Sequence, residues 1–92
     1  MRLNEEEITN AICLHFASRL QKDPSEVEVQ LLWDEELGFS AQIWVGERDQ
    51  FLIESNINEA ISRYLVNEHG IRVYPDQIRL EFDDEIYAEI AV

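Results

Sequence analysis

The chain repeats one order of hydrophobic spacings, and this repeat limits the folds that it can adopt. Apolar residues recur at helical spacing over residues 5–21 and again between Asn56 and Gly70. Each helical stretch is followed by stretches in which apolar and polar residues alternate, the pattern of half-buried strands. The spacing therefore predicts two quasi-repeated α-β-β halves, with one additional strand between them.

Local signals mark the ends of both helices. Asn4 and Glu7 have the spacing of a capping box at the start of the first helix. Asp23-Pro24 ends that helix, because proline disfavours helical geometry in the residue before it. Ser55 or Asn56 is expected to cap the second helix, and Gly70 is placed to stop it.

Five strands are expected, with two acidic turns between strand pairs. The strands lie near residues 27–33, 39–45, 48–54, 78–82 and 86–92, the last including Val92. Gly46-Glu47 fits a two-residue hairpin turn. In the strand after this turn, Phe51 and Ile53 are expected to point into the core.

These elements predict a single α+β domain over residues 1–92. The expected order is α-β-β-β-α-β-β, in two layers: one five-stranded sheet with both helices on one face. The pattern leaves the strand order open. The apolar stripes Ile8/Ile12/Phe16/Leu20 and Ile57/Ile61/Tyr64/Leu65 are expected to pack against the sheet.

The charge excludes some classes of partner. Seven Lys and Arg stand against 20 Asp and Glu, a net charge of −13. Nucleic-acid binding needs clustered basic residues, and anionic membranes repel such a chain. Cys13 is the single cysteine and cannot form an internal disulfide. We therefore expect a cytoplasmic protein without nucleic-acid or membrane partners.

Acidic residues gather at one end of the expected fold, and we call this end the acidic pole. The expected directions of the strands place the turn after the first strand, the turn before the last strand and the start of the first helix at this end. The pole comprises Glu5, Glu6 and Glu7, the turn Asp34, Glu35 and Glu36, and the turn Asp83, Asp84 and Glu85. Carboxylates suit hard cations, so the two turns are candidate ligands for Ca²⁺ or Mg²⁺. The plainer alternative is solvated turns that add charge for solubility.

No motif of catalysis or cofactor binding stands out. Cys13 and His15 are two residues apart on a helix and point in different directions. We expect no catalytic residue and no cofactor, and the sequence favours a non-enzymatic protein. Alternation instead places Leu32, Trp44 and Tyr87 on the sheet face away from the helices. These three residues are the candidate interface, either with a second copy or with another protein.

Three stretches resemble the YxcD-like family of small Bacillus proteins: NAICLHFA, DPSEVEVQLLWDEELGFSAQIWV and NINEAISRYL. The resemblance implies a small cytosolic bacterial protein and supplies no functional residues. The hypothesis from the sequence is thus an acidic interaction module that forms a homodimer or binds another protein. The alternative is a divalent-cation-binding protein that uses the acidic pole.

Overall fold

Two helices and two three-stranded antiparallel sheets make up the computed structural model of the protein, which describes residues 1–91. The α+β class and both helices are as predicted. Of the last predicted strand, Val92 lies outside the described residues. The elements follow the chain in this order: β1 (Arg2–Leu3), α1 (Glu5–Leu20), the 3₁₀ turn η1 (Pro24–Glu26), β2 (Val27–Asp34), β3 (Gly38–Val45), β4 (Arg48–Ile53), α2 (Glu54–His69), the 3₁₀ turn η2 (Pro75–Gln77), β5 (Ile78–Phe82) and β6 (Ile86–Ile90).

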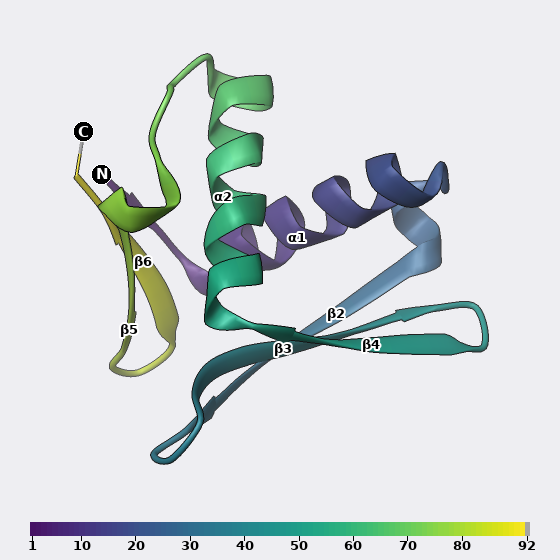
Figure 1. Ribbon diagram of the computed structural model, residues 1–92, viewed down its shortest axis with the longest axis horizontal. Coiled ribbons are helices and arrows are strands. Elements are labelled where there is room, and N and C mark those ends of the chain that lie inside the picture. The colour runs from purple at the N-terminus through teal and green to yellow at the C-terminus, as the bar shows by residue number, and fades with distance from the viewer. Residues whose placement is uncertain (92) are drawn as a thin grey trace.

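The prediction of a single five-stranded sheet was wrong. One sheet has the order β2-β3-β4, and the other has the order β1-β6-β5. The unpredicted strand β1 pairs with β6, placing Arg2 opposite Glu89 and Leu3 opposite Ala88. The first sheet is thus formed by three consecutive strands, and the second is completed by a strand from the start of the chain. Figure 1 shows the two sheets as separate bodies, set at an angle to each other.

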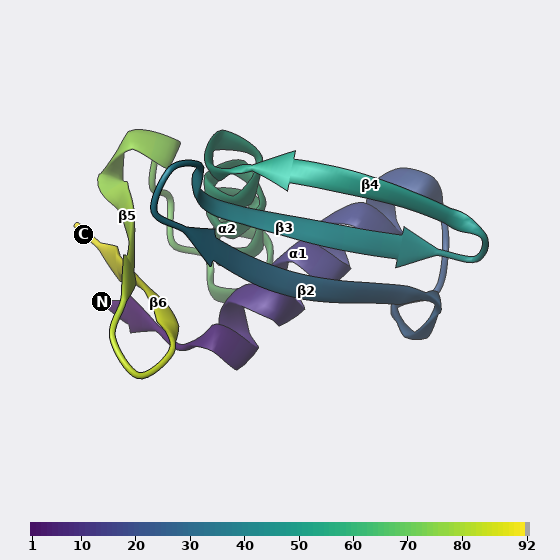
Figure 2. The ribbon, with the colours of Figure 1, turned by 90° about the horizontal axis from the view of Figure 1, so that it is seen from below.

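Both helices pack on the same face of the β2-β3-β4 sheet, as predicted. Figure 2 shows this sheet in front of the helices, with its other face uncovered. Ile8, Ile12, Ile57 and Ile61 have no exposed surface and meet Ala41, Ile43 and Leu52 in one core. Leu20 ends the predicted stripe but is 46% exposed, since α1 stops at this residue.

The predicted capping signals were confirmed for α1 and shifted for α2. The Asn4 side chain accepts a hydrogen bond from the Glu7 amide at 2.8 Å, and the Glu7 carboxylate accepts one from the Asn4 amide at 3.2 Å. Helix α2 begins at Glu54, earlier than predicted, and the Asn56 side chain accepts from the Ile53 amide at 3.1 Å. Gly70 ends α2 in the left-handed region, with φ of 65°.

The prediction of which β4 residues point into the core was also wrong. Leu52 is 1% exposed, whereas Phe51 and Ile53 are 54% and 59% exposed. The two-residue turn pairs Val45 with Arg48, and this register places Leu52 opposite the buried Ala41. Phe51 and Ile53 therefore point to the uncovered side of the sheet.

The two halves of the chain exchange their leading strands. Strand β1 precedes α1 and β4 precedes α2, so each half has the order β-α-β-β with a 3₁₀ turn after its helix. Each leading strand pairs with the hairpin of the other half: β4 with β3, and β1 with β6. One row across each sheet has the same residue types, leucine–alanine–leucine. The row is Leu31–Ala41–Leu52 in the first sheet and Leu80–Ala88–Leu3 in the second. Thus β4, which the sequence left without a counterpart, corresponds to β1.

Candidate functional site

The uncovered side of the β2-β3-β4 sheet carries a row of apolar side chains, and we call it the open face. Opposite residues in a ladder share a face, so the register defines its rows. Three rows cross all three strands: Leu32–Ser40–Ile53, Gln30–Gln42–Phe51 and Glu28–Trp44–Asp49. Beyond Leu32 the face ends with the pair Asp34–Gly38. Three of these eleven residues are charged: Glu28 and Asp49 at the Trp44 end, and Asp34 at the Leu32 end.

Leu32 and Trp44, two of the predicted interface residues, both lie on the open face but are not neighbours. The Gln30–Gln42 row separates them. Phe51 lies opposite Gln42 and diagonal to Trp44, and Ile53 follows it on the same side of β4. Phe51 and Ile53 therefore add two apolar side chains to the face, with Phe51 diagonal to Trp44 and Ser40 between Ile53 and Leu32.

Polar side chains on the open face are already held in place. The Gln42 side-chain amide donates to the Asp49 carboxylate at 2.9 Å. Ser40 is only 5% exposed, in the row between Leu32 and Ile53. The face therefore combines a hydrogen-bonded glutamine and aspartate pair with apolar side chains.

Tyr87, the third predicted interface residue, lies on the other sheet. It belongs to β6, and the Arg2 guanidinium stacks over its ring at 4.3 Å. Arg2 also forms an ion pair with Glu89 at 2.6 Å. Since the sheet is divided in two, Tyr87 does not join the open face and is partly covered by its own chain.

The segments of the acidic pole are connected by specific contacts. The Ile86 amide donates to the Glu5 carboxylate at 3.1 Å, which joins the start of α1 to the β5-β6 turn. Trp33, just before the first acidic turn, stacks on Phe82, just before the second. Figure 1 shows both hairpin turns at the same end of the molecule.

The first acidic turn contributes to local structure. The Asp34 carboxylate accepts hydrogen bonds from the amides of Glu36 and Leu37, at 2.8 and 3.2 Å. Within residues 1–91, no three Asp, Glu, His or Cys side chains lie close enough to hold a metal ion together. The predicted candidates Asp34, Glu35, Glu36, Asp83, Asp84 and Glu85 are thus near one end but not gathered into a ligand set.

Cys13 is half-buried beside the start of β2. Its thiol donates to the Pro24 carbonyl at 3.2 Å, and burial raises the pKa of the thiol. A raised pKa keeps the sulfur protonated and poorly nucleophilic at neutral pH. This is the structural role expected for a lone cysteine on a packed helix.

Comparison with known proteins places the chain in a family. Residues 1–85 match the family described as "Protein of unknown function (DUF2653)". The chain belongs to this family. It is 30% identical over 82 residues to the "Uncharacterized protein YxcD" of Bacillus subtilis (strain 168), covering 88% of this chain and 80% of that protein. The match confirms the resemblance expected from the sequence.

No solved structure matches the chain. In the part of the chain that the structure describes, neither helix combines the length and the apolar character that crossing a membrane requires.

Proposed function

We propose that this member of the DUF2653 family is a non-enzymatic cytoplasmic interaction module that pairs with a second copy of itself through the open face. The observation that carries the proposal is the exposure of Phe51 and Ile53, more than half exposed on the same face as Leu32 and Trp44. Several exposed aromatic and aliphatic side chains on one face are typical of an interaction surface.

The charge distribution favours a second copy as the occupant. A chain with a net charge of −13 repels itself over most of its surface. The open face carries fewer charges, since eight of its eleven residues are uncharged. Two copies can therefore meet here without placing many carboxylates against one another. A basic partner would find few acidic residues on this face to recognise.

Sedimentation velocity over a concentration series tests this proposal. The wild-type chain is expected to shift from monomer to dimer mass as concentration rises, and more readily at high salt because salt screens the net charge. Phe51→Ser and Trp44→Ser should each weaken the dimer at least about tenfold, as for anchor residues at an interface centre.

Tyr74→Ser is the matched control. Tyr74 is 64% exposed in the segment before β5 and does not belong to the open face, so its loss should leave the dimer unchanged. Monomer mass at every concentration for the wild-type chain would contradict self-association. Equal dimerisation of the Phe51→Ser variant would show that another surface mediates it.

A further inference from the structure

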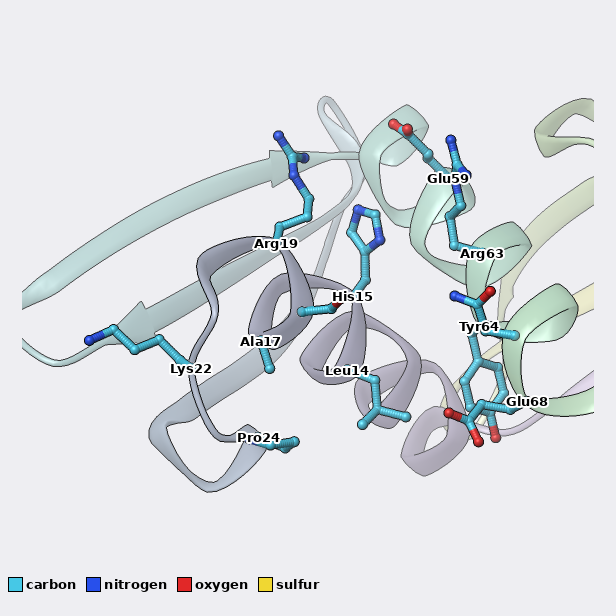
Figure 3. A pocket seen from close by; sticks show the side chains of 12 residues that line it. Leu14, His15, Ala17, Arg19, Lys22, Pro24, Glu59, Arg63, Tyr64 and Glu68 are labelled. Atoms are coloured by element: carbon cyan, nitrogen blue, oxygen red, sulfur yellow. The ribbon is translucent and has the colours of Figure 1, made fainter.

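The molecule has a groove between α1 and α2 where basic side chains gather, and we call it the helix groove. Its volume is about 830 Å³. Arg19 lines it from α1 and Arg63 from α2, and Lys22, in the segment after α1, lies at its edge with its ammonium group directed away (Figure 3). Figure 3 shows the His15 ring between Arg19 on one side and Arg63 on the other.

This concentration of positive charge is unusual for the chain. Three of its seven Lys and Arg residues line the helix groove, although acidic residues outnumber basic ones by 20 to 7. The ion pairs found in residues 1–91 belong to Arg2 and Arg79, on the other sheet. Arg19, Lys22 and Arg63 thus have no carboxylate within 4.0 Å among the described residues. Their donors are available to a ligand.

His15 lies between these positively charged side chains. Burial lowers the pKa of its ring, the charges of Arg19 and Arg63 lower it further, and Glu59 opposes them. Glu68, Tyr64 and Lys22 line the same groove. The ring is therefore neutral at pH 7 and can donate one hydrogen bond next to two guanidinium groups.

We propose that the helix groove binds an organic phosphate monoester, with Arg19, Arg63 and His15 holding the phosphate. A guanidinium presents a planar pair of donors that matches a phosphate oxyanion, and two of them come from facing helices here. Glu59 and Glu68 also line the groove, and their charge disfavours polyphosphates.

The size and lining of the groove indicate that the phosphate belongs to a larger molecule. A volume of about 830 Å³ lies within the range of roughly 300–1,000 Å³ that small-molecule sites have, far above the size of a bare phosphate. Leu14, Pro24 and Tyr64 supply apolar surface for a carbon skeleton. The two carboxylates can accept hydrogen bonds from its hydroxyl groups.

Calorimetric titration with glycerol 1-phosphate, inorganic phosphate and chloride at equal ionic strength tests the proposal. Saturable binding of both phosphates is expected, tighter for glycerol 1-phosphate, and none of chloride. Arg19→Gln and Arg63→Gln should each weaken phosphate binding at least about tenfold, since each removes a charge-assisted hydrogen bond. Glu59→Gln should strengthen it.

Arg72→Gln is the matched control, because Arg72 is exposed and does not line the groove. It should bind both phosphates like the wild-type chain. Binding that is equally weakened in Arg72→Gln, or unchanged in Arg19→Gln and Arg63→Gln, would overturn the site. If inorganic phosphate binds as tightly as glycerol 1-phosphate, the groove does not recognise the organic part of the ester, and that part of the proposal is wrong.

A second measurement does not depend on affinity alone. The nuclear magnetic resonance titration of the His15 ring should show a higher pKa in the presence of glycerol 1-phosphate, because the bound anion favours the protonated ring. The same titration in the Arg63→Gln variant should respond weakly to the ligand. An unchanged His15 titration at saturating ligand would place the anion elsewhere.

Discussion

The Trp33 and Phe82 rings stack with their centroids 5.2 Å apart and their planes at 10°. Trp33 belongs to β2 and Phe82 to β5, so the contact joins two sheets that share no strand pairing. Both rings extend the inward alternation of their strands to the acidic pole. Trp33 remains 44% exposed and Phe82 51% exposed, so the stack lies at the surface end of both strands.

The stack should therefore couple the two sheets energetically. In a double-mutant cycle with Trp33→Leu and Phe82→Leu, we expect a coupling energy of about 0.5–1.5 kcal/mol, the range for aromatic pairs. Urea denaturation measures each free energy of unfolding. Additive effects of the two substitutions would mean that the rings contribute only by their separate burial.

Phe16 should be a strong determinant of stability. This side chain of α1 is 5% exposed and belongs to the hydrophobic core. We expect Phe16→Ala to lower the free energy of unfolding by about 3–5 kcal/mol, measured by urea denaturation at unchanged slope. Leu37→Ala, at a turn residue 74% exposed, is the control and should change it little.

His15 should make stability depend on pH in the mildly acidic range. Burial lowers its pKa in the folded chain below the ordinary value of 6.5. As pH falls through 6.5, the unfolded chain binds a proton that the folded chain does not, so stability decreases until the folded-state pKa is reached. His15→Gln should remove this component, giving a flatter stability profile below pH 6.5 in denaturation experiments. An identical profile in the variant would contradict it.

Salt should stabilise the fold through general screening of its negative charge. We expect the melting temperature to rise with NaCl, and Ca²⁺ or Mg²⁺ at equal ionic strength to add nothing specific. Replacing Glu35 and Asp84 by lysine should raise the melting temperature at low salt, because both substitutions relieve repulsion at the acidic pole. A large extra gain with micromolar Ca²⁺ that these substitutions abolish would instead favour the cation-binding alternative.

The exchange of leading strands predicts that the chain can be cut in its middle and reassembled. Fragments 1–46 and 47–92 separate at the Gly46-Glu47 turn, and each lacks the strand that completes its sheet. We expect each fragment alone to be largely unfolded by circular dichroism, and an equimolar mixture to recover the native spectrum. A fragment that folds fully by itself would argue against the exchange as a source of stability.

The helices and most strands could be predicted because their spacing and caps are local signals. Asn4 and Glu7 lie within one turn, and Gly70 ends α2 by its own backbone conformation. The division into two sheets could not be predicted, because β1 has only two residues and no alternation to read. Its partner, β6, is also at the far end of the sequence.

The inward residues of β4 could have been predicted. A two-residue turn at Gly46-Glu47 implies that Val45 pairs with Arg48, and counting back along both strands places Leu52 opposite Ala41. Phe51 and Ile53 look like core residues by type alone, and the register decides against them. Of the candidate sites, Leu32 and Trp44 followed from alternation. The helix groove did not, because it depends on how α1 and α2 cross.

The exchanged leading strands also bear on how the protein unfolds. Separation of β1 from β6 exposes an edge of the second sheet, but β1 is continuous with α1, whose side chains pack under the first sheet. Separation of β4 from β3 likewise disturbs the packing of α2, which follows β4 directly, and of the second hairpin. We therefore expect the two halves to unfold together, so that hydrogen exchange in both sheets proceeds through one global, cooperative unfolding event.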